Sequence, residues 1–307
     1  MAATVGDLLD IGSLERSLGQ LTPQYASAAP FPHIVFDDVL RPEAIQRAYV
    51  ELAQIDPTSW ANYLHVNERK HANTNPDTWG PMLRSISAAL MSERFSSFLG
   101  QLTGFRFLRP DPTLDGGGLH RCTAGGYLNV HADFTAHHTN PLWRRRVNLL
   151  LYLNPEWQPQ WGGDLELWST DMSRREVTVA PIGNRMLVFT TADDSYHGFP
   201  AGLRCPPGVA RHSLALYYFT EESERHVKPT NYRARPGDGG KRVAIYLDRQ
   251  ALGLYDVVKR RLRLSDDFAS RGLASINRLR STFANGRRRA VGSTSSAGEA
   301  DDSSPHP

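Results

Sequence analysis

The chain has 307 residues, of which 40% are apolar, so it can bury a sizeable core in one large catalytic domain or two small ones. Its formal net charge of +3 argues neither for nor against nucleic acid as a partner of the whole chain. Two cysteines, Cys122 and Cys205, are too few for a disulfide framework or a thiolate zinc site and are typical of a reducing compartment. No signal peptide or membrane-length apolar run is expected, so we predict a cytoplasmic protein.

The N-terminal third indicates helices around one strand, because apolar residues recur there mostly at helical spacing. Proline favours the first turn of a helix, and glycine follows the end of one. The expected elements are a short helix with a linker over 1–30, a strand over 33–37, a helix from Pro42 to 55, irregular structure over 56–82, and a helix over 85–104 that ends at Gly104.

From Phe105 onward, short runs rich in β-branched and aromatic residues alternate with Gly, Pro and Asn turns, which is typical of a sandwich or barrel. Strands are expected at 125–134, 145–154, 162–169, 176–182, 185–191 and 213–220. Together with the preceding helices, they predict an α+β fold with a β-sandwich core.

The chain after Glu221 is polar and rich in Pro and Gly up to Gly240. Helical patterns follow over 242–263 and 265–283, and the composition of 284–307 predicts disorder. The expected divisions are an N-terminal helical support region with an entry strand (1–104), the β-rich core (105–221), a C-terminal loop and helical extension (222–283) and a disordered tail (284–307).

The sharpest chemical signal is His131 followed two residues later by Asp133. Side chains two apart on a strand point to the same face, so both can reach one metal ion. Tyr127 and Asn129 share that face. An inward polar face is costly unless something uses it.

A third ligand is available in His197, which follows the expected strand at 185–191. Two histidines and one carboxylate on one face of a metal form the facial triad of non-haem iron(II) oxygenases, whose other face stays open. The remaining candidates fit less well. His137 and His138 are expected in a polar loop, and His120 is expected in a surface loop. His212 is expected on the strand face opposite to that of Arg211 and Ser213.

Arg211 and Ser213 share one face of the last expected core strand. A planar guanidinium with a hydroxyl beside it is suited to binding a carboxylate. A surface salt bridge is the simpler interpretation for an isolated Arg. The position just downstream of His197 instead favours a ligand-binding role.

Six ordered segments between residues 30 and 221 resemble the 2-oxoglutarate- and Fe(II)-dependent oxygenases, specifically their prolyl 4-hydroxylase-like branch. The segments are PFPHIVFDDVL (30–40), HAD (131–133), YLNPEW (152–157), GGDLELW (162–168), YHG (196–198) and RHSLALYYFT (211–220). The resemblance implies a double-stranded β-helix, or jelly roll, flanked by N-terminal helices and followed by a C-terminal helical extension.

The resemblance also implies the cofactors: Fe(II), 2-oxoglutarate as co-substrate, O₂, and L-ascorbate as an optional reductant. Fe(II) would be bound by His131, Asp133 and His197. The distal carboxylate of 2-oxoglutarate would pair with Arg211 and Ser213, helped by Tyr152, which shares a strand face with Asn148. Tyr127 lies four residues before the first ligand instead of the usual three, so the role of the family tyrosine is not carried over to it. The segment 201–208 is the expected insertion near the rim of the site.

The same residues allow other functions. A zinc hydrolase would accept the same three ligands, and a non-enzymatic binding protein could use the same scaffold. Among oxygenases, the retained carboxylate favours hydroxylation over halogenation. The substrate is either a protein or peptide side chain, proline first, or a free amino acid or small biosynthetic intermediate. Residues 256–290 carry ten basic and three acidic side chains, which predicts a solvated helix face or an anionic partner.

Overall fold

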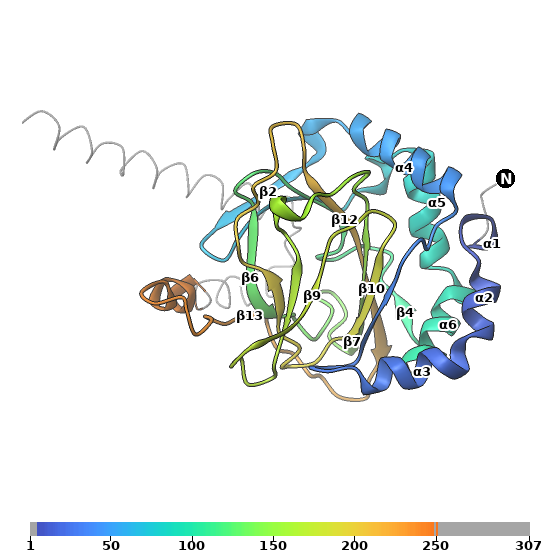
Figure 1. Ribbon diagram of the computed structural model, residues 1–307. Coiled ribbons are helices and arrows are strands. Elements are labelled where there is room, and N and C mark those ends of the chain that lie inside the picture. Colours follow the sequence, from blue (N-terminus) through green and yellow to red (C-terminus); the bar gives the residue numbers. More distant parts are fainter. Residues whose placement is uncertain (1–4, 249, 251–307) are drawn as a thin grey trace, which may run out of the picture. The chain divides into compact units, whose positions relative to one another are not determined.

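The computed structural model describes residues 5–248 and 250 (Figure 1). Its helices are α1 (Val5–Leu8), α2 (Ile11–Arg16), α3 (Leu18–Ser27), α4 (Pro42–Gln54), α5 (Pro81–Leu90) and α6 (Glu93–Thr103). Its strands are β1 (His33–Phe36), β2 (Ala61–His65), β3 (Glu68–Asn73), β4 (Arg109–Pro110), β5 (Gly118–Cys122), β6 (Tyr127–Ala132), β7 (Trp143–Tyr152), β8 (Leu165–Trp168), β9 (Arg175–Val179), β10 (Met186–Thr190), β11 (His197–Phe199), β12 (Arg211–Glu221) and β13 (Asn231–Tyr232).

Within the described residues, thirteen strands pair in one antiparallel sheet, with the path β1-β10-β7-β12-β5-β3-β6-β11-β8-β9. β13 pairs with β6, β2 with β3, and β4 with β12. The sheet is strongly curled, so that β6 and β11 face β7 and β12 across the interior (Figure 1). This arrangement confirms the double-stranded β-helix expected from the sequence.

Alternate side chains of β7 belong to two different hydrophobic clusters. Leu149, Leu151 and Leu153 join the cluster formed with the helices, whereas Leu150 and Tyr152 join the cluster inside the curled sheet. Because both faces of the second half of β7 are buried, the strand is apolar from Leu149 to Tyr152. β7 and β12 therefore form the wall that separates the helical layer from the interior.

The N-terminal helices cover one outer side of this wall (Figure 1). Phe95, Phe98 and Leu102 of α6 pack in the same cluster as the outward residues of β7, β10 and β12. The hydroxyl of Tyr218 on β12 donates to the carbonyl oxygen of Leu90 at 2.7 Å. The helices thus fix the strands that carry Tyr152 and Arg211.

The expected helix over 85–104 is two helices in the structure. Ser92 breaks it and caps α6, because its hydroxyl accepts a hydrogen bond from the backbone N–H of Phe95. The end at Gly104 is confirmed, and the residue has a left-handed φ of 78° that glycine adopts without strain. The N-terminal segment also holds three helices, α1 to α3, where one was expected.

The prediction of irregular structure over 56–82 is wrong, because β2 and β3 lie there and β3 joins the central sheet. Likewise, His120 lies on β5 and pairs with Ser213, not in a surface loop. A helix occupies residues 241–248 of the described part, inside the expected pattern over 242–263. The predictions for 265–283, for the tail 284–307 and for most of the basic stretch 256–290 fall outside the described residues. No helix among the described residues is long and apolar enough to cross a membrane.

Candidate active site

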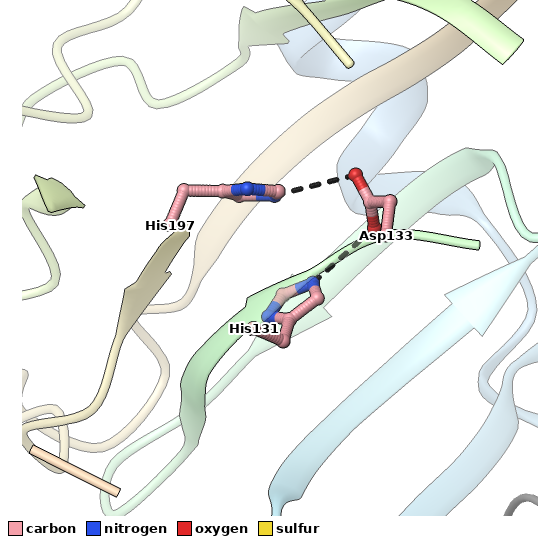
Figure 2. A group of neighbouring side chains, drawn as sticks. All are labelled: His131, Asp133 and His197. Atoms are coloured by element: carbon pink, nitrogen blue, oxygen red, sulfur yellow. Dashed lines mark ion pairs between the residues drawn. The ribbon is translucent and has the colours of Figure 1, made fainter. Parts of the chain in front are cut away.

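The three expected metal ligands meet at the paired ends of β6 and β11 (Figure 2). His131 and His197 lie directly opposite each other in the antiparallel register, and their ring centroids are 4.6 Å apart. Asp133 follows β6 and turns its carboxylate to both rings. Its Oδ1 lies 3.3 Å from Nε2 of His131, and its Oδ2 lies 3.5 Å from Nε2 of His197.

Both imidazoles are held in the same tautomer by backbone carbonyls. Nδ1 of His131 lies 2.9 Å from the carbonyl oxygen of Asn129, and Nδ1 of His197 lies 3.0 Å from that of Ser195. A carbonyl oxygen only accepts, so each Nδ1 carries the proton and each Nε2 presents a lone pair. Such contacts behind a ligand histidine are typical of protein metal sites.

The charges of the site suit a cation. Burial alone would raise the pKa of the Asp133 carboxyl, but the positive charge of Arg145 opposes it, and the pKa lies well below its usual range. Burial lowers the pKa of His197 to about 4, although Asp133 opposes this shift. At neutral pH the site therefore offers an ionised carboxylate and a neutral imidazole, which are the forms that bind metal.

The donor set therefore fits Fe(II). One ligand atom from each of His131, Asp133 and His197 lies within 4.8 Å of the others, and these three form the one such group among the described residues. Two imidazole nitrogens and one carboxylate oxygen, all buried on one side, match a 2-His-1-carboxylate triad.

Arg211 is buried at the start of β12 on the inner face of the sheet. Its Nε donates to the carbonyl oxygen of Gly163 at 2.9 Å, and its NH2 donates to the hydroxyl of Tyr152 at 3.4 Å. Its guanidinium carbon lies 4.2 Å from the ring centroid of Phe199, two residues after His197 on β11. These two hydrogen bonds leave further N–H donors on a guanidinium that has five.

Gly163 makes this approach to Arg211 feasible. It has a φ of 82°, which side chains with a Cβ rarely adopt, and an added Cβ would lie 3.1 Å from Cδ of Arg211 and 2.5 Å from a methyl of Leu203. The second glycine of GGDLELW therefore has a direct structural reason: it lets the backbone accept a hydrogen bond from Arg211 at close range.

The other expected co-substrate residues lie on β7 and β12. Ser213 is buried and pairs with Tyr152 across the two strands. Asn148 shares the inner face of β7 with Tyr152 but lies at the metal end, where its Nδ2 donates to Oδ2 of Asp133 at 2.6 Å. The structure thus brings Arg211, Ser213 and Tyr152 together and places Asn148 beside the metal ligands.

Tyr127 and Asn129 point away from the metal ligands. The hydroxyl of Tyr127 donates to the carbonyl oxygen of His65, and the amide of Asn129 donates to Asn67 and Val66. Both side chains tie β6 to the turn between β2 and β3. Strand parity alone had suggested that they share the polar face of the site.

Two residues near the candidate metal ligands could not be predicted from the sequence. Arg145 on β7 is buried and lies 3.1 Å from Asp133, and Tyr232 on β13 stacks on His131 with ring centroids 5.2 Å apart. Arg145 lies in a run of three arginines that is typical of a surface. Tyr232 lies beyond the last core strand in a polar segment, so neither carried a signal.

Comparison with known proteins supports the same reading of the site. Residues 117–219 match the family model of the 2OG-Fe(II) oxygenase superfamily. No curated protein matches the chain. Among solved structures, a Trichoplax adhaerens prolyl hydroxylase in complex with a hypoxia inducible factor peptide fragment is 17% identical, covers 68% of this chain and 92% of its own, and has a TM-score of 0.50.

A Pseudomonas putida prolyl-4-hydroxylase is also 17% identical; the match covers 67% of this chain and all of that one, with a TM-score of 0.47. The Trichoplax match is a likeness of fold, and the family match covers the strands that carry Arg211 and the two candidate ligand histidines, His131 and His197. The chain is a 2OG-Fe(II) oxygenase with a prolyl-hydroxylase-like fold, an oxidoreductase that uses Fe(II), 2-oxoglutarate and O₂.

Proposed function

We propose that this enzyme hydroxylates an unactivated C–H bond at an iron held by His131, Asp133 and His197. The observation that carries the proposal is the convergence of these three ligand atoms within 4.8 Å, with each histidine Nδ1 held by a backbone carbonyl. A histidine fixed in this way cannot turn its Nε2 aside without losing a hydrogen bond in a buried site.

We assign the distal carboxylate of 2-oxoglutarate to Arg211, Ser213 and Tyr152. β7 supports this assignment because it connects the two ends of the site: Asn148 contacts Asp133, and Tyr152 contacts Arg211. Four residues of a strand span about 13 Å, and the side chains at both ends shorten the gap. A five-carbon dicarboxylate can bridge the remainder. Asn148, which the sequence suggested as a co-substrate residue, receives a supporting role at the metal ligands.

The bound iron and 2-oxoglutarate supply the oxidising chemistry that converts C–H into C–OH, with succinate and carbon dioxide as the other products. The chain supplies the geometry and a largely dry interior. Asp133 fills the ligand position that a halide would need, which favours hydroxylation. A zinc hydrolase would have no use for a buried arginine beside Phe199 and Tyr152, so Arg211 counts against that alternative.

As substrate we propose a prolyl residue of a protein or peptide. The support is the fold shared with a prolyl hydroxylase that was solved with a peptide fragment bound. A free amino acid or small biosynthetic intermediate is the competing outcome of a substrate panel. The cytoplasmic location, an anionic partner of the basic 256–290 stretch, L-ascorbate as reductant and the domain boundaries after 104, 221 and 283 stay predictions from the sequence.

The proposal is tested under anaerobic conditions. Fe(II) and 2-oxoglutarate added together should produce a weak metal-to-ligand charge-transfer band in the visible, and His131→Ala should abolish it. A band that survives this substitution would show that the ligand assignment is wrong. Succinate release is then measured across proline-containing peptides, free amino acids and small metabolites. Stimulation by small molecules alone would reject the peptide substrate.

A further inference from the structure

Arg145 carries a positive charge that is buried in the protein. Its side chain is 1% exposed, although it lies in the run Arg144-Arg145-Arg146. By contrast, Arg146 reaches outward to Glu222 at 2.6 Å and Thr220 at 2.8 Å. Because burying a charge is costly unless it is paired, the site of Arg145 must provide a specific partner.

A bulge in β7 turns Arg145 toward the site. Val147 pairs with Tyr218, but the next pair is Arg145 with Phe219, so Arg146 is an extra residue. The extra residue reverses the alternation, and Arg145 joins the inner face that also carries Asn148. Without the bulge, Arg145 would share the outer face of Val147 and point to the helices.

Arg145, Asn148 and Asp133 form a closed ring of contacts around one carboxylate oxygen. Oδ2 of Asp133 accepts a hydrogen bond from Nδ2 of Asn148 at 2.6 Å and forms an ion pair, without hydrogen-bond geometry, with Nη2 of Arg145 at 3.1 Å. Oδ1 of Asn148 accepts from Nε of Arg145 at 2.6 Å and from the hydroxyl of Thr191 at 3.1 Å. These donors fix the orientation of the Asn148 amide, which in turn fixes the carboxylate.

Two aromatic rings hold the guanidinium in place. The guanidinium carbon of Arg145 lies 3.3 Å from the ring centroid of Tyr217 and 4.6 Å from that of Phe134. Tyr217 is itself anchored, because its hydroxyl donates to the carbonyl oxygen of Gly116 at 2.8 Å. Arg145 is therefore a rigid part of the site.

We propose that Arg145 and Asn148 are positioning residues that bind Oδ2 of Asp133 and so leave Oδ1 as its one metal ligand. This inference rests on the proposed ligand set. In a six-coordinate ion, three protein ligands leave two positions for 2-oxoglutarate and one for O₂. A carboxylate that bound through both oxygens would occupy the position that O₂ needs. The clamp, defined as Arg145 with Asn148, keeps that position open.

The test uses Co(II), whose absorption in the visible reports coordination number and affinity, on the full chain. Asn148→Leu, which is close in volume but cannot hydrogen-bond, and Arg145→Met each break the clamp. We expect the Co(II) dissociation constant to rise about 10- to 100-fold in both variants. We also expect the spectrum of the Co(II)–2-oxoglutarate complex to shift. Arg145→Lys should restore part of the affinity, because it keeps the charge but loses the planar fork.

Arg146→Met is the matched control, since its contacts are to Glu222 and Thr220, and it should bind Co(II) like the wild type. If Arg145→Met does not fold, Asn148→Leu still tests the clamp, because it removes both the donor to Asp133 and the acceptor for Arg145. Unchanged affinity and spectrum in a folded Asn148→Leu variant would overturn the proposal. So would a change confined to the substrate KM in the Arg145 variants.

The His131→Ala variant distinguishes an error in the ligand set from an error in the clamp. If it leaves Co(II) binding intact, the ligand set itself is wrong. If it abolishes binding while both clamp variants behave like the wild type, the ligand set stands and the clamp is rejected.

Discussion

Tyr232 stacks on His131, a proposed metal ligand, with ring centroids 5.2 Å apart and an interplanar angle of 34°. The two residues are paired in register, because β13 adds to the edge of β6 (Figure 1). Tyr232 is buried and lies beyond residues 117–219, which match the family model. A segment outside the matched region thus packs against the candidate metal site.

Replacing Tyr232 by alanine should loosen His131 and weaken metal binding. Aromatic pairs contribute about 0.5–1.5 kcal/mol beyond their buried area, so affinity for Fe(II) or Co(II) should fall by up to about tenfold. Tyr232→Phe keeps the ring and should bind metal like the wild type. Equal affinity in the alanine and phenylalanine variants would show that the stacking does not support His131.

Arg211→Ala should weaken 2-oxoglutarate binding much more than metal binding. Removing one member of a buried charge pair costs on the order of 2–5 kcal/mol, which raises the dissociation constant roughly 30-fold or more. Arg204→Ala is the control, because Arg204 is exposed and contacts the carbonyl oxygen of Gln160. Calorimetric titration of 2-oxoglutarate in the presence of metal distinguishes them. A larger loss in the Arg204 variant would move the carboxylate site there.

The strands that could be predicted from the sequence contain runs of apolar residues. β7, β10 and β12 each contain an apolar run and lie near turn residues, so their positions could be predicted from the sequence. β2 and β3 could not, because charged and polar residues occupy both faces. The burial of these charged residues is compensated by ion pairs that form in the folded protein. His65 and Lys70 contact the two oxygens of Glu68 at 2.8 and 2.9 Å. Such pairing across a turn has no local signal.

The candidate site could likewise be predicted from the sequence only in part. The spacing of His131 and Asp133 on one strand indicated two candidate ligands, and the position of His197 after the strand at 185–191 indicated the third. Arg145 was hidden because the bulge at Arg146 breaks the alternation on which face assignments rest. Tyr232 was hidden because a two-residue strand in a polar segment has no periodicity.

His212 should make the fold sensitive to acid. Burial, with Arg121 nearby, lowers its pKa to about 4 from an ordinary 6.5. Above pH 6.5 the imidazole is neutral whether the chain is folded or unfolded, so its contribution to stability is complete. As the pH falls from 6.5 toward 4, the unfolded chain takes up a proton that the folded chain resists. Stability then declines by about 1.4 kcal/mol per pH unit for this group.

His212→Gln should therefore flatten the decline between pH 6.5 and 4. Urea unfolding of chelator-treated protein at several pH values measures it. The slope should not vanish, because burial also lowers the pKa of His120 to about 3 and that of His197 to about 4. Parallel stability curves for the variant and the wild type would contradict the assignment. His212 lies opposite Trp60 and away from the metal ligands, so the metal affinity of the variant at pH 7 should match that of the wild type.

The last prediction concerns the product. Asp133 is held by Asn148 and Arg145 at Oδ2, so its carboxylate stays at the metal and the position that a halide would need is filled. We expect a hydroxylated product that carries one oxygen atom from O₂, and no chlorinated product at high chloride. Mass spectrometry of the product formed under labelled oxygen measures this once a substrate is identified. A chlorinated, desaturated or epoxidised product from the wild type would reject the assignment of the reaction.

Substitutions of Asp133 sharpen this prediction. Asp133→Ala should lose most of its metal affinity, because two protein ligands remain of three. Asp133→Glu keeps a carboxylate but moves it by about one bond length, and errors near 1 Å in a reacting site can lower the rate by about 10²-fold. We therefore expect the glutamate variant to bind Co(II) while releasing little succinate. Wild-type turnover in this variant would show that the position of the Asp133 carboxylate does not control the reaction.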